Sequence, residues 1–191
     1  MKRLMDLVKP FLSLIFGVLM FLYYLNMLGA EGAALALGII GLVVGTYYLA
    51  VGIMGIVWPG MPDNLKKIFN IISVSAFPGF MFVWFLLNVI QAYEVLTPSL
   101  WVISILGMIA SLSLCVFYII SRFNKQDIMV RLTSMFGLVF VLCLISWVLF
   151  ATFGGNQMTW STTIGEIEVV PLLLYGLYCV LMLNSLKKEA E

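Results

Sequence analysis

The feature that most constrains this chain is a series of long apolar stretches that contain no charged side chain. Six of them occur along 191 residues, and each has about the 20 residues that an α-helix needs to cross roughly 30 Å of hydrocarbon. We place them at 10–28, 33–58, 68–90, 99–121, 132–153 and 169–186. None alternates polar and apolar residues as a membrane-spanning β-strand does. The sequence therefore predicts an all-α polytopic membrane protein, with six transmembrane helices in a compact bundle that forms a single domain over residues 1–191.

The composition supports a membrane environment. Hydrophobic residues make up 63% of the chain and charged residues only 10%, whereas soluble domains have about 45–50% and about 25%. This leaves too little polar surface to cover a water-exposed globule. The net charge of +1 gives no support to a nucleic-acid partner, so the lipid bilayer is the first partner that the sequence predicts.

Basic and acidic residues separate between the connections. Every lysine and arginine falls before the first stretch, after the last, or in the second and fourth connections. The other three connections hold only acids, namely Glu31, Glu94, Glu166 and Glu168. Because short loops rich in Lys and Arg stay in the cytoplasm, we expect a multi-pass protein of the cytoplasmic membrane with both termini inside.

The chain lacks the residues that most catalytic and metal sites use. It contains no histidine, and none of the six stretches contains Asp, Glu, Lys or Arg. The cysteines are Cys115, Cys143 and Cys179, each inside an apolar run, and this spacing is not that of a disulfide framework or a zinc site. We therefore expect no enzymatic activity, no cofactor and no metal.

The second stretch carries a stripe of glycines. At about 100° per residue, five glycines fall on one face of this helix: Gly38, Gly41, Gly45, Gly52 and Gly55. Small residues let another helix approach closely in a membrane, and Gly41 with Gly45 matches the G-x-x-x-G pattern. Two interpretations stay open at this point. The face packs inside the same bundle, or it docks another subunit or a second copy.

The third stretch contains Pro78 and Gly79 near its middle. Proline removes a backbone donor and clashes with the preceding turn, so we expect a kink or a local break near 75–79. Broken helices form binding sites in some transporters, usually in repeat-related pairs. No matching interruption occurs in the second half of the chain, which favours a plain kink.

Polar side chains gather toward the predicted outer end of the third stretch. Trp84, Asn88 and Gln91 stand at i, i+4 and i+7, on one helix face. Tyr23 and Asn26 lie at a similar depth in the first stretch. Such amides either lock helices together or line an outward-facing pocket. That pocket would have Glu94, Glu166 and Glu168 at its rim and would favour a cationic or polyhydroxylated solute over an anion.

The tryptophans lie near the predicted membrane boundaries. Four fall toward the outer side and one toward the inner side: Trp84, Trp101, Trp147, Trp160 and Trp58. Interfacial anchoring explains this distribution without a ligand.

Two functional hypotheses follow. The first is a non-enzymatic multi-pass protein that acts as a subunit of a larger membrane assembly through the glycine face, with other membrane subunits or a second copy as partner. The alternative is a substrate-binding or transport subunit with an outward pocket for a small polar or cationic solute.

Overall fold

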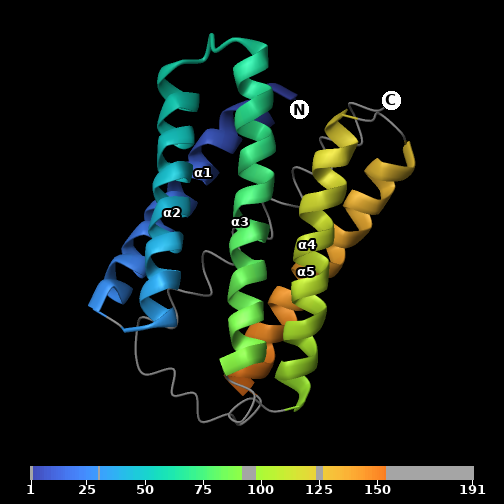
Figure 1. Ribbon diagram of the computed structural model, residues 1–191. Helices are drawn as coiled ribbons and strands as arrows, with labels where there is room; N and C mark the ends of the chain where they lie inside the picture. Colours follow the sequence, from blue (N-terminus) through green and yellow to red (C-terminus); the bar gives the residue numbers. More distant parts are fainter. Residues whose placement is uncertain (1, 30, 92–97, 124–126, 154–191) are drawn as a thin grey trace. The chain divides into compact units, whose positions relative to one another are not determined.

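The computed structural model shows an all-helical chain and describes residues 2–29, 31–91, 98–123 and 127–153 (Figure 1). In chain order the helices are α1 (Lys2–Leu25), the 3-10 turn η1 (Asn26–Gly29), α2 (Ala33–Val57), α3 (Asp63–Gln91), α4 (Pro98–Phe123) and α5 (Asp127–Phe153). The five α-helices are each long and apolar enough to cross a membrane. They correspond to the first five predicted spans, and the sixth, at 169–186, lies outside the described residues.

Local sequence signals explain where the helices begin and end. Gly32 has a φ of 62° just before α2, a conformation that glycine adopts readily. α2 ends before Pro59, because proline disfavours a helical residue in front of it. α4 begins on Pro98, at the first helical position where a missing N–H costs nothing. Asp63 and Asp127 stand in the first turns of α3 and α5, next to the partial positive charge of the helix amino terminus.

Two prolines lie inside helices. Pro10 lies inside α1, which begins at Lys2 and therefore earlier than the predicted start at Pro10. Polar residues extend this helix beyond its membrane-crossing part. α3 continues through Pro78 as one helix, and the bend expected at this proline stays a prediction. Pro78 is fully buried.

The chain divides into two compact units, residues 1–73 and 74–191, and the boundary falls within α3. In the first unit α1 and α2 lie side by side as an antiparallel hairpin (Figure 1). Polar contacts join α1 to α2 and join α2 to the part of α3 that belongs to this unit. Ser13 Oγ donates to the Tyr48 carbonyl at 3.0 Å, and the Tyr48 hydroxyl donates to the Ser73 carbonyl. Tyr47 donates to the Phe69 carbonyl at 2.9 Å.

The second unit contains the rest of α3 together with α4 and α5. α4 and α5 lie side by side. Phe77 of α3 meets Phe140 of α5 edge to face, with ring centroids 6.4 Å apart. A Cβ built on Gly107 of α4 would lie 2.5 Å from the Phe85 ring of α3, so only glycine leaves room for that ring. Phe85 and Phe140 are both fully buried and form the centre of this unit.

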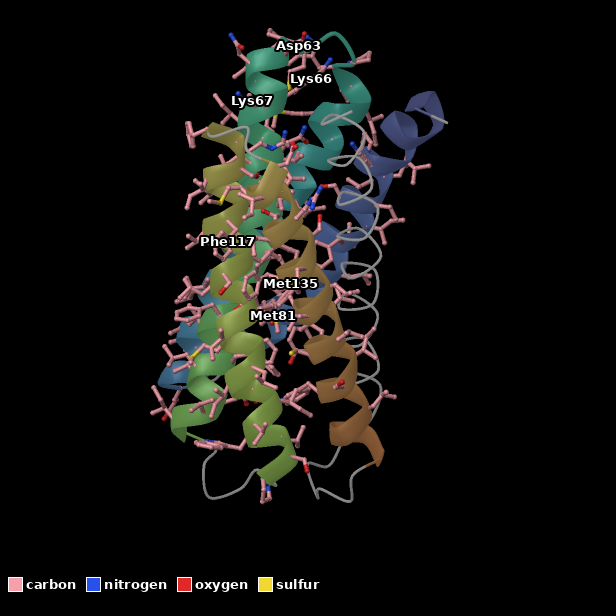
Figure 2. All side chains as sticks on the ribbon, turned by 90° about the vertical axis from the view of Figure 1, so that its right-hand side faces the viewer. Asp63, Lys66, Lys67, Met81, Phe117 and Met135 are labelled. Atoms are coloured by element: carbon pink, nitrogen blue, oxygen red, sulfur yellow. The ribbon has the colours of Figure 1, made fainter. Side chains whose placement is uncertain are left out.

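The charged residues at the beginning of α3 are exposed (Figure 2). Lys66 Nζ lies 3.9 Å from Asp63 Oδ1. An exposed pair of this kind contributes little to stability. Lys66 and Lys67 are instead the residues that the positive-inside rule places in the cytoplasm, and this orientation stays a prediction.

Candidate functional site

The glycine face of α2 is covered by α1. A Cβ built on Gly45 would lie 2.9 Å from the Phe21 nitrogen, and one on Gly52 would lie 2.7 Å from the Leu14 nitrogen. Real Cβ atoms do not approach backbone atoms so closely. The two helix backbones therefore come together at a distance that only glycine permits.

The same contact extends along the whole hairpin. Each glycine of the stripe meets a residue of α1 or η1, and the partners follow in reverse order as α2 advances. The pairs are Gly38 with Met27, Gly41 with the Tyr24 ring, Gly45 with Phe21, Gly52 with Leu14 and Gly55 with Pro10. The stripe is thus the internal packing surface of an antiparallel helix pair. Another subunit could contact it only if α1 separated from α2.

The opposite face of α2 is exposed and apolar. It comprises Ile39, Val43, Thr46, Ala50 and Ile53, whose 3–4 spacing follows one side of the helix. Three of them are half exposed or more, at 50% for Ile39, 65% for Val43 and 52% for Ile53. Thr46 and Ala50 make the middle of this seam shallow, and shallow seams allow close helix approach in a membrane. We call these five residues the exposed seam of α2.

Comparable exposed faces on the second unit have larger side chains. α4 exposes Val102, Leu106 and Ile109, and α5 exposes Leu138 and Leu142. Large apolar side chains suit contact with lipid as well as with protein. Among these faces, the exposed seam of α2 has the small residues that favour a helix partner.

A group of tryptophan and asparagine side chains lies in the second unit. Trp84 of α3 and Trp147 of α5 meet edge to face, with ring centroids 4.5 Å apart and an angle of 74° between the planes. Asn88 Nδ2 donates to the Trp84 carbonyl at 3.0 Å. Trp84 and Asn88 are half-buried, whereas Trp147 is 6% exposed. We call these three residues the tryptophan site.

The indole nitrogen of Trp147 is buried and has no hydrogen-bond partner among the described residues. Other polar groups on these helices find acceptors on their own helix, as Ser104 does on the Leu100 carbonyl at 2.8 Å and Thr133 on the Met129 carbonyl at 2.8 Å. An indole ring is too long and rigid to bond in this way. Leaving a buried donor unpaired costs about 1–3 kcal/mol, so we expect an acceptor that is not among the described residues.

The residues of the predicted outward pocket are divided between the two units and the residues that are not described. Trp84 and Asn88 share one face of α3, as expected from their spacing. Tyr23 belongs to the first unit, where its ring meets Tyr24 edge to face at 4.7 Å, and Asn26 begins η1 in the same unit. Gln91 is the last residue of α3. Glu94, Glu166 and Glu168 lie outside the described residues.

The surroundings of Pro78 show how α4 supports α3 at this point. The Cys115 thiol donates to the Ser75 carbonyl at 3.4 Å, and the Ser75 hydroxyl is buried without a hydrogen-bond partner among the described residues. A Cβ built on Gly79 would meet nothing within 4 Å. Proline cannot supply the helical hydrogen bond that would stiffen this turn, and the thiol of the neighbouring helix contacts the same turn.

The position of Trp147 is one that the sequence analysis missed. Its place near a predicted boundary indicated an interfacial anchor, but its side chain is buried inside the second unit. A signal was present in the sequence. Thr133, Gly137, Phe140, Leu144 and Trp147 recur every three or four residues, and all five are buried. This is the inward face of α5, and Trp147 continues it.

These helices define the general class of the protein. In the described part of the chain, five apolar helices of membrane-crossing length fit a multi-pass membrane protein. Comparison with protein-family models, curated proteins and solved structures gives no match for this chain.

Proposed function

We propose that the protein is a non-enzymatic subunit of a larger membrane assembly, and that it docks a transmembrane helix of another subunit on the exposed seam of α2. The observation that carries this proposal is the shallow middle of that seam at Thr46 and Ala50, on a helix whose other face is already filled by α1. This moves the docking surface from the glycine face to the opposite side of the same helix.

The physical argument rests on how helices associate in lipid. Lipid tails are as apolar as leucine, so close packing must replace the hydrophobic effect as the driving force. A seam with small residues at its centre and β-branched residues around it gives a partner helix more contact than a face of large, mobile side chains. Ile39, Val43 and Ile53 supply the β-branched part of this seam.

The test is copurification from native membranes in a gentle detergent. We expect a stoichiometric membrane protein to accompany the wild-type chain and to be lost from Ala50→Leu, which fills the shallow part of the seam. Val102→Leu is the matched control, because Val102 is 51% exposed on α4, and it should retain the partner. A partner that stays bound to Ala50→Leu, or a wild-type chain that purifies alone, would count against the proposal.

A second candidate function is a substrate-binding or transport subunit for a small solute. It is favoured by the Trp147 N–H, a buried donor that lacks an acceptor among the described residues, on a ring that contacts Trp84. Solute binding should raise the melting temperature of the purified protein, and Asn88→Leu should abolish that rise. If no member of a broad metabolite panel stabilises the wild type, this candidate loses its support.

A further inference from the structure

Helix α3 is the element that belongs to both units. It runs as one helix from Asp63 to Gln91 (Figure 1), and the boundary between the two compact units falls between Ser73 and Val74. The beginning of this helix therefore packs with the first unit and its remainder with the second. The turn where α3 passes from one unit to the other determines how stiffly the two are joined.

The part of α3 before the boundary is held by two tyrosines of α2. The Tyr47 hydroxyl donates to the Phe69 carbonyl at 2.9 Å and lies 3.2 Å from Ser73 Oγ. The Tyr48 hydroxyl donates to the Ser73 carbonyl, and Ser73 is 1% exposed. These contacts fix α3 to the first unit as far as Ser73.

The part of α3 after the boundary is held by α4 and α5. The Cys115 thiol of α4 donates to the Ser75 carbonyl at 3.4 Å. The Phe77 ring meets Phe140 of α5 edge to face, with centroids 6.4 Å apart. Contacts with the second unit thus begin two residues after Ser73, where the contacts with α2 are still close by along the chain.

Pro78 weakens α3 at this change of partners. An α-helix would place a hydrogen bond from the N–H of residue 78 to the carbonyl of Val74, and proline has no N–H to donate. The missing bond is the one that would start from the first residue after the boundary. Gly79 follows, and a Cβ built on it would meet nothing within 4 Å, so there is open space beside this turn. Helices bend most often at such positions.

We propose that the turn of α3 from Val74 to Gly79 is a hinge, at which the two units change their angle to each other. Each unit keeps its own contacts with α3 during this motion, because those contacts lie on either side of the weakened turn. Such a hinge is compatible with both candidate functions and depends on neither. A partner or ligand that binds the bent and straight forms unequally would shift the balance between them.

The experiment measures how widely the distance between the units is distributed. Spin labels are attached to a ketone-bearing amino acid placed at two positions of the full chain in lipid nanodiscs, which keeps the three native cysteines. The pair between the units is Ile39 with Leu106, and the pair within the first unit is Ile39 with Ile15, all about half exposed. Double electron–electron resonance should give a broader distribution for the first pair than for the second.

Variants assign the excess width to the hinge. Pro78→Ala restores the donor to the Val74 carbonyl and should narrow the Ile39–Leu106 distribution to the width of the pair within the first unit. Gly79→Ala keeps the buried proline ring, places its methyl group in open space, and should remove part of the excess width. Pro10→Ala is the matched control, because it removes the proline inside α1, and it should leave the distribution unchanged.

Two results would overturn the hinge. Equal widths for the two pairs in the wild-type chain mean that α3 joins the units rigidly. An excess width that persists in both Pro78→Ala and Gly79→Ala means that the motion arises elsewhere in the chain. If Pro78→Ala does not fold, Gly79→Ala decides: a narrower distribution supports the hinge, and an unchanged one refutes it.

Discussion

At the scale of single residues, consecutive tyrosines hold the hairpin to the first turns of α3. The hydroxyls of Tyr47 and Tyr48 reach the carbonyls of Phe69 and Ser73, one helical turn apart. The Tyr48 side chain is 1% exposed and its ring also meets Phe16 edge to face at 4.8 Å. Polar groups in an apolar surrounding thus serve as interhelical contacts, which is the common role of such groups in membrane helices.

Tyr48→Phe should lower the free energy of unfolding by about 1 kcal/mol, within the range measured for interhelical hydrogen bonds in membranes. The ring contact with Phe16 remains, so the loss reports the hydroxyl alone. The measurement is an unfolding titration with SDS in mixed micelles. Tyr23→Phe is the control, because the contact of Tyr23 is made by its ring, and it should have no effect. Equal losses in the two variants would refute the role of the Tyr48 hydroxyl.

At the scale of secondary-structure elements, α2 has two faces with different surroundings. One face is glycine-rich and in backbone contact with α1, and the other is the exposed seam. An added methyl group at Gly52 would lie 2.7 Å from the Leu14 nitrogen, whereas one at Gly79 of α3 would meet nothing within 4 Å. The same substitution therefore has different consequences in the two helices.

Gly52→Ala should destabilise the protein by about 1–3 kcal/mol, because a well-packed contact must open to admit the methyl group. Gly79→Ala should leave stability unchanged or raise it by up to about 1 kcal/mol, since alanine has the higher helix propensity. SDS unfolding of both variants provides the comparison. If Gly52→Ala is as stable as the wild type, the close approach of α1 and α2 is wrong.

At the scale of the whole molecule, the separation of basic and acidic residues between the connections predicts a membrane topology that can be tested. Lys66 and Lys67 are exposed near the beginning of α3, and the acidic connections carry no basic residue. The positive-inside rule places the two kinds of connection on opposite sides of the membrane. The number of spans follows from which side each connection occupies.

Single cysteines introduced into a cysteine-free background should report this topology. We expect Glu31→Cys and Glu166→Cys to react with a membrane-impermeant maleimide in intact cells, and Lys66→Cys and Lys188→Cys to react only after permeabilisation. If the cysteines at 166 and 188 label from the same side, the stretch at 169–186 does not span the membrane. If the one at 66 labels from outside, the predicted orientation is inverted.

Much of the helical framework could be predicted because its signals are local. A run of apolar residues with the length of a bilayer specifies a helix, and Pro59 and Pro98 mark where helices stop and start. The sequence therefore predicted five described helices, with differences confined to their ends. The uninterrupted course of α3 through Pro78 was less predictable, because packing on a neighbouring helix can support a turn that proline weakens.

By itself, the sequence determined which segments are apolar helices and which glycines share a face of α2. Only the tertiary structure decided that α1 fills that face and that Trp147 points into the second unit beside Trp84. The physical reason is that lipid and protein interior are equally apolar, so hydropathy cannot tell a side chain that faces lipid from one that faces another helix. That choice depends on contacts between residues far apart in the chain, such as Gly52 with Leu14 and Trp84 with Trp147.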